Sequence, residues 1–209
     1  METERTLSSQ ELKRLELLKQ KEAELEALGY EKSALSFKQG SLSTSLAALP
    51  FALLIFIPYY KSYGTFCPLT YGLNVWNMLL LLIGGIVILS LSSELIRGLS
   101  LALFAPGHFR ALSMGLSSKG RLIYLSQPLE KWQFITASLM PALILGIIPG
   151  IAAIKSGSLL LLFASVLMIL WSGGDILTSL RLLIKSSGPE ALYIENPTES
   201  GIFEFKKKS

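Results

Sequence analysis

The sequence predicts an all-α membrane protein with about four transmembrane helices, an amino-terminal amphipathic helix and a small cytoplasmic β-hairpin element. Hydrophobic residues make up 51% of the 209 residues and charged residues only 16%, whereas roughly 25% of an average soluble domain is charged. The apolar residues are gathered into long runs with few charges between them, as in a membrane domain. Lysine and arginine are unevenly distributed over the connections between these runs.

Residues 1–40 are expected to form a cytoplasmic helical arm. Ser8 stands three residues before Glu11, the spacing of a capping box, and good helix formers continue until Gly29. The leucines of this helix form an incomplete stripe, so we expect it to lie on the membrane or against the protein body rather than in a coiled-coil dimer. The arm is too charged to be a cleavable signal, so the first span is expected to be the anchor.

Residues 41–186 are expected to form a four-span membrane domain. Its apolar stretches lie near residues 42–60, 73–104, 134–154 and 159–184. Each can cross a hydrocarbon core, which takes about 20 helical residues. Glu94 and Arg97 interrupt the second stretch and Asp175 the fourth. Kinks or helix ends are predicted at four prolines, Pro50, Pro58, Pro141 and Pro149.

The distribution of positive charge predicts the topology. The arm holds seven lysines and arginines, the loop between the second and third spans four, the tail three, and the two remaining loops one each, Lys61 and Lys155. The positive-inside rule therefore places both termini and the middle loop in the cytoplasm. The charges do not form a basic stripe interleaved with aromatic residues, so a nucleic-acid partner is not expected.

Three short polar segments are predicted to be strands. Residues 121–125 follow a turn-like Ser-Ser-Lys-Gly sequence in the middle loop. Residues 191–195 and 201–205 flank a turn-rich sequence in the cytoplasmic tail, residues 187–209. In the third span, Gly146 and Gly150 have the GxxxG spacing that allows close helix packing, although Pro149 between them favours a bend equally.

The segment that carries most chemical information lies late in the second span, where residues 93–99 read Ser-Glu-Leu-Ile-Arg-Gly-Leu. This segment resembles the helix motif HELxHGL with both histidines replaced. In an HExxH helix the two histidines share one face and bind zinc, while the glutamate activates the metal-bound water. A second segment, Trp-Ser-Gly-Gly-Asp-Ile at residues 171–176, resembles the Gly-Asp segment that supplies a third, carboxylate ligand in membrane zincins.

Together the two segments and the order of the spans resemble a family of four-span zincin peptidases of bacterial membranes, related to site-2 proteases. The resemblance extends over residues 41–205. It implies a bacterial cytoplasmic membrane, and it places Ser93 and Arg97 at the two histidine positions. Glu94 then stands at the general-base position and Asp175 at the third-ligand position.

The departures from the motif suggest that the peptidase chemistry is lost. Serine is a poor zinc ligand, and arginine stays cationic and cannot coordinate a metal. We therefore expect a non-enzyme, a catalytically inactive pseudopeptidase that binds, scaffolds or regulates a membrane partner protein in the lipid bilayer. Ser93, Glu94, Arg97 and Asp175 are its vestigial site positions, with no catalytic, cofactor-binding or metal-binding residue and no cofactor.

Other interpretations remain open. The main alternative is an active intramembrane metallohydrolase whose altered metal site uses His108, the only histidine, with Glu94 and Asp175, although Arg97 would repel the metal. Glu94 and Arg97 also have the i,i+3 spacing of a simple helical ion pair that reaches to water. Charges within a membrane additionally mark ion paths, so transport is a third class. If the resemblance holds, Arg97 is expected to lie as a cation between Glu94 and Asp175.

Overall fold

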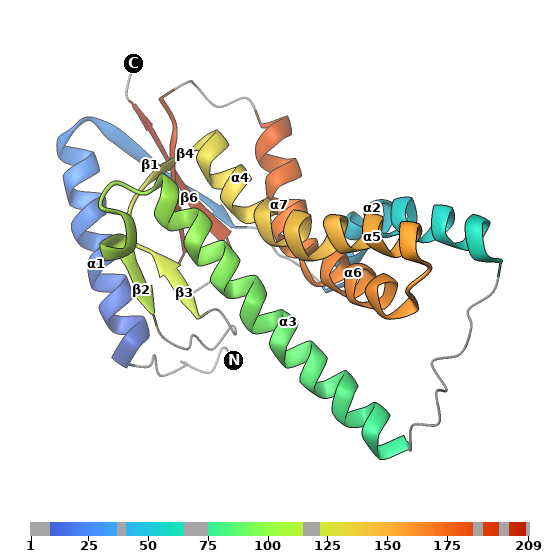
Figure 1. The fold of residues 1–209 in the computed structure, drawn as a ribbon. Helices are drawn as coiled ribbons and strands as arrows, with labels where there is room; N and C mark the ends of the chain where they lie inside the picture. The colour runs from blue at the N-terminus through green and yellow to red at the C-terminus, as the bar shows by residue number, and fades with distance from the viewer. Residues whose placement is uncertain are drawn as a thin grey trace, which may run out of the picture. The chain divides into compact units, whose positions relative to one another are not determined.

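The computed structural model describes residues 9–36, 41–64, 75–114, 122–185, 190–196 and 201–207 (Figure 1). The chain forms two compact units that alternate along the sequence. Unit 1 comprises Met1–Lys38, Arg97–Ala137 and Leu182–Ser209, and unit 2 comprises Gln39–Ile96 and Ser138–Arg181. The predicted boundaries near residues 40 and 186 stay predictions.

Unit 1 contains a four-stranded antiparallel sheet. Its order is β1 (Tyr30–Ser36), β6 (Gly201–Lys207), β5 (Leu192–Glu195) and β4 (Leu129–Glu130). A second, two-stranded sheet pairs β2 (Leu112–Met114) with β3 (Ile123–Leu125), beyond a short 3₁₀ helix, η1 (His108–Ala111).

The structure confirms strands in the three segments predicted to form them, although Arg121 lies outside the described residues. The extent of the sheet was underestimated. The predicted β5–β6 hairpin is only the middle of a larger sheet, since β1 of the arm pairs with β6 along seven residues.

The arm consists of a helix followed by an edge strand, not of a helix alone. Helix α1 (Ser9–Ala27) ends just before Gly29, whose φ of 84° is a left-handed conformation that glycine adopts without steric cost. Leu18 and Leu25, two turns apart, are buried with Ile194 and Phe205 of the sheet. Burial of this leucine stripe fastens α1 to the sheet of its own unit (Figure 1).

Three helical segments are long and apolar enough to cross a membrane. They lie in α2 (Ser41–Tyr63), in α3 (Val75–Phe104), and in the run formed by α4 (Lys131–Pro141), η2 (Ala142–Ile147) and α5 (Ile148–Ser156). Helix α4 ends at Pro141, one of the prolines at which a kink or helix end was predicted, and a π-helical turn, η2, begins directly after it. Pro50 and Pro58 lie inside α2 rather than at its ends.

The fourth predicted span is a bent pair of helices. Helix α6 (Leu159–Trp171) and helix α7 (Gly173–Ile184) meet at Ser172 with a bend of 52°. The pair is apolar enough to count as one broken span, so the described chain has three such spans, or four with this pair. The apolar stretch predicted over residues 159–184 is therefore two helices, and two adjacent glycines at the bend weaken a helix interior there.

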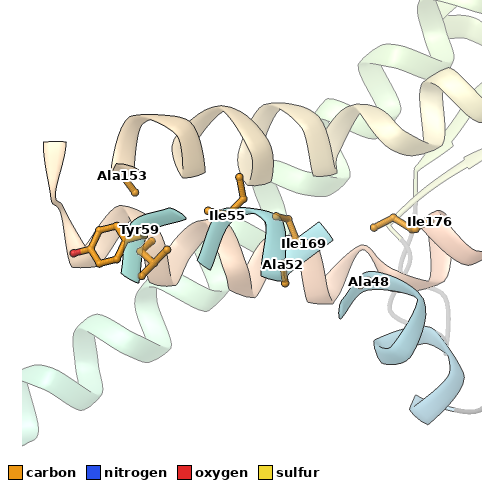
Figure 2. Close-up of a cluster of buried hydrophobic side chains, with 8 residues drawn as sticks. Ala48, Ala52, Ile55, Tyr59, Ala153, Ile169 and Ile176 are labelled. Atoms are coloured by element: carbon orange, nitrogen blue, oxygen red, sulfur yellow. The ribbon is translucent and has the colours of Figure 1, made fainter. Parts of the chain in front are cut away.

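The apolar core of unit 2 is built from α2, α5 and the bent pair (Figure 2). Helix α2 contributes a stripe at helical spacing, Ala48, Ala52, Ile55 and Tyr59, which packs with Ala153, Leu162, Ile169 and Ile176. A Cβ on Gly146 would lie 2.7 Å from Ile169, and one on Gly150 would lie 2.6 Å from Ser165 and 2.8 Å from Ile55. The two glycines therefore allow the close packing that their GxxxG spacing predicts.

Hydroxyl groups tie these helices together through hydrogen bonds to backbone carbonyls. Ser165 donates to the carbonyl of Gly146 at 2.7 Å, inside the π-helical turn. Tyr59 donates to the carbonyl of Gly157 at 2.8 Å and Tyr63 to that of Ile154 at 3.0 Å. The end of α2 is thus fixed to the turn between α5 and α6.

Candidate functional site

Helix α3 carries the motif segment, with Ser93, Glu94 and Arg97 all in helical conformation. Ser93 and Glu94 belong to unit 2 and are half-buried. Arg97 belongs to unit 1, and only 3% of it is exposed. A charged side chain buried to this degree requires a compensating group close by.

Glu195, the last residue of β5, provides that group. Its Oε1 atom accepts a hydrogen bond from Nη2 of Arg97, and the two side chains form an ion pair in which only 3% and 4% of the side chains are exposed. The partners are 98 residues apart in the sequence. Arg97 is thus bound to the carboxy-terminal part of the chain.

Tyr124 of β3 forms a hydrogen bond with the backbone of Glu195. Its hydroxyl donates to the carbonyl oxygen of Glu195 at 3.2 Å. Burial raises the pKa of Tyr124 well above its usual value, and the nearby positive charge of Arg14 offsets part of this increase. The hydroxyl is therefore protonated, and able to donate, throughout the neutral pH range.

Arg14 of α1 completes the contacts around Tyr124. Its Nη2 atom donates to the carbonyl oxygen of Leu122 at 3.5 Å, and its guanidinium carbon lies 5.5 Å from the centre of the Tyr124 ring. That distance is within the range of a cation–π interaction. Burial lowers the pKa of Arg14, and electrostatic interactions with Tyr124 and Glu11 oppose this shift.

Gly98, the residue after Arg97, brings α3 close to β3. A Cβ at this position would clash with the side chain of Ile123, lying 3.2 Å from its Cγ2 and 3.4 Å from its Cγ1. The glycine of the motif segment therefore serves packing in this chain. Two consecutive residues of β3 therefore lie next to the ion pair. Ile123 packs beside Gly98, which follows Arg97, and Tyr124 donates a hydrogen bond to the backbone of Glu195.

Asp175 lies in the first turn of α7 and is half-buried in unit 2. A carboxylate there is favoured by the positive end of the helix dipole. The preceding Gly173 packs against the backbone of α2, since a Cβ on it would lie 2.9 Å from the carbonyl carbon of Thr44. The Gly-Asp segment thus places its aspartate directly after the helix break.

His108 begins η1 in unit 1 and is exposed. Its φ of 51° is left-handed, and its Nδ1 atom lies 3.2 Å from the carbonyl oxygen of Ala102. Because a carbonyl can only accept, this contact favours the tautomer with the proton on Nδ1.

The structure brings together Arg97 and Glu195. Glu195 was not predicted as a site residue from the sequence. The predicted position of Arg97 between Glu94 and Asp175 stays a prediction, since Glu94 and Asp175 belong to the other unit. Tyr124 and Arg14 were missed as well. A signal for Glu195 was present, because a carboxylate that ends a buried strand requires a partner.

Comparison with protein families matches residues 86–188 to a family described as "Putative zincin peptidase". The match supports a zincin-like family for this chain. It covers just under half of the sequence and includes all four positions singled out above, Ser93, Glu94, Arg97 and Asp175. No curated protein and no solved structure matches the chain.

This family description corrects the expectation that the chain is not an enzyme, because it names peptidases. The zincin-like part of the predicted resemblance is supported. The relation to site-2 proteases stays a proposal. The interpretation of residues 93–97 as an HExxH motif that has lost its histidines also stays a proposal.

The residues present at the motif do not fit zinc. Ser93 and Arg97 provide no imidazole nitrogen, and Arg97 is held in an ion pair with Glu195. Among the described residues, no group of three or more His, Cys, Asp or Glu side chains is placed to hold a metal ion. We therefore derive no chemical step from a metal at this helix.

Proposed function

We propose that this chain is an integral protein of a bacterial cytoplasmic membrane that recognises a polypeptide segment at the level of the bilayer. The observation that carries the proposal is the family match, which spans both acidic segments and names a class of proteins that act on polypeptides. The long apolar helices support insertion in the membrane. The uneven distribution of lysine and arginine supports cytoplasmic termini.

Glu94 and Asp175 are the residues we propose for recognition. Both are half-buried carboxylates in segments long and apolar enough to span the bilayer. An ionisable group there costs roughly 2.5 to 3.5 kcal/mol at mid-bilayer, so such groups usually face a partner or a cavity. Carboxylates can accept hydrogen bonds from backbone N–H groups or from basic side chains of a bound segment.

Hydrolysis of the bound polypeptide is the second candidate function. The family description favours it. Glu94 stands at the position that the motif assigns to the general base, and it is a half-buried carboxylate, a group that can serve as a general base.

Site-specific photocrosslinking in native membranes tests recognition. A photoreactive residue at Leu95, which is 63% exposed next to Glu94, should capture a discrete polypeptide. The same residue at Leu80, 69% exposed on the same helix but four turns away, is the matched control and should not. Glu94→Gln combined with Asp175→Asn should reduce the Leu95 product at least about fivefold, as expected for the loss of about 1 kcal/mol of binding.

The length of the captured polypeptide separates the two functions. A shorter product in the wild type than in Glu94→Gln indicates hydrolysis, and equal length indicates recognition alone. Capture that is equal at Leu95 and Leu80, or unchanged by the two acid substitutions, would show that the acids do not recognise a polypeptide.

A further inference from the structure

We infer that Arg97 and Glu195 form a permanent ion pair at the position where the HExxH motif has a metal ligand. This pair fastens α3, the motif helix, to the carboxy-terminal strands β5 and β6. This inference does not depend on the proposed function. It begins with the contact itself, in which Nη2 of Arg97 donates to the Glu195 carboxylate within unit 1.

Burial makes the two charges dependent on each other. The side chains are 3% and 4% exposed, so water contributes little to either charge. Removing one member of such a pair leaves an uncompensated buried charge and is strongly destabilising, whereas replacing both by apolar residues is often close to neutral. An ion pair whose single loss is costly and whose double replacement is nearly neutral stabilises the fold, unlike an ion pair on the surface.

The surroundings are built to hold both members in place. Ile123 fills the space beside Gly98, the residue after Arg97, so α3 packs closely on β3 at this point. Tyr124, the next residue of β3, donates to the backbone of Glu195 at 3.2 Å. Arg14 of α1 in turn lies over the Tyr124 ring. One short strand thus connects the amino-terminal helix, the motif helix and the tail.

The ion pair accounts for arginine at a histidine position. A guanidinium stays charged when desolvated and repels a divalent cation, and its planar group suits a carboxylate partner. Glu195 meanwhile uses one of its oxygens for Arg97. On helix α3, the position that would hold a metal ligand is therefore used for a fixed ion pair with β5.

A double-mutant cycle on the full-length protein in detergent tests the inference. Arg97→Leu and Glu195→Leu alone should each lower the melting temperature by about 10 °C, given the cost of an unpaired buried charge and the usual sensitivity of melting temperature at this chain length. The combination Arg97→Leu/Glu195→Leu should recover at least about half of the larger single loss.

The pair between Lys32 and Glu22 in the same unit is the matched control. Its atoms are 2.7 Å apart, but its side chains are 27% and 22% exposed. Lys32→Leu and Glu22→Leu should each change the melting temperature by less than about 3 °C. If the Arg97 and Glu195 variants behave like this control, or if the double variant loses the sum of the single losses, the inference is wrong.

Failure to fold is also informative. If Arg97→Leu yields no folded protein while Arg97→Leu/Glu195→Leu does, the pair is supported, because loss of the arginine is then harmful only while the Glu195 carboxylate is present. If neither folds, while the control variants do, removal of the pair is not compensated and the inference is contradicted.

Discussion

Arg97 of helix α3 donates a buried, ion-paired hydrogen bond to Glu195 of strand β5, across 98 residues of sequence. The charge of Arg97 is therefore balanced by a carboxylate from the tail of the chain. The same helix carries Glu94 three residues earlier, half-buried in the other unit.

Gly98→Ala should lower the free energy of unfolding by about 1 to 3 kcal/mol, the usual cost of overpacking. The added methyl group would clash with Ile123. Gly85→Ala in the same helix is the control, since a Cβ there has open space, and it should be neutral or stabilising by up to about 1 kcal/mol. Thermal unfolding in detergent measures both. Ile123→Val should restore part of the loss in Gly98→Ala, and an equal effect at Gly98 and Gly85 would contradict the packing.

Gly173→Ala should be more damaging than Gly98→Ala, with a loss of roughly 3 kcal/mol or more. Here the added Cβ meets the backbone of Thr44, lying 2.9 Å from its carbonyl carbon, and a backbone cannot rotate away as a side chain can. Gly84→Ala, with open space around it, is the matched control. A Gly173→Ala protein that melts within about 2 °C of the wild type would show that α7 does not pack on α2 in this way.

Tyr124 should make the protein sensitive to alkaline pH. Burial raises its pKa in the folded state, whereas an unfolded tyrosine titrates near 10. The folded state therefore holds the proton more tightly, so this stabilisation is complete below about pH 10 and is lost as the pH rises above it. Between pH 9 and 11 the wild type should lose about 3 to 5 °C more in melting temperature than Tyr124→Phe. Parallel pH profiles would contradict a buried, protonated Tyr124.

The sequence was sufficient for elements whose cause is local. Gly29 predicted the end of α1, the apolar runs predicted α2, α3 and the third span, and turn residues predicted β5 and β6. The Gly146 and Gly150 spacing predicted close packing because the reason for it lies in the small size of the residues themselves. Such features need no knowledge of distant segments.

Features that depend on distant partners were missed. Strand β1 has no clear alternation of apolar and polar residues and is defined by its pairing with β6. Glu195 was missed because its partner lies far away in the sequence. The break at Ser172 was missed for another reason, since the adjacent Gly173 and Gly174 offered a local signal that the apolar run outweighed.

The membrane topology gives a prediction that depends only on the charge distribution. Reporter fusions after Lys61 and Lys155 should report the outer side, because their loops carry one positive charge each. Fusions after Lys119 and at the carboxy terminus should report the cytoplasm. An inside signal at Lys155 together with an outside signal at the carboxy terminus would contradict the four-span topology.

Zinc binding tests the central claim most directly, namely that Arg97 has replaced a metal ligand by its pair with Glu195. Full-length protein purified without chelator, dialysed against micromolar zinc and measured by elemental analysis should hold less than about 0.1 equivalent of zinc, because Ser93 and Arg97 provide no ligand nitrogen. Glu94→Gln and Asp175→Ala should leave that value unchanged. About one equivalent of tightly bound zinc, lost in both variants, would contradict the claim and restore a metal site to this helix.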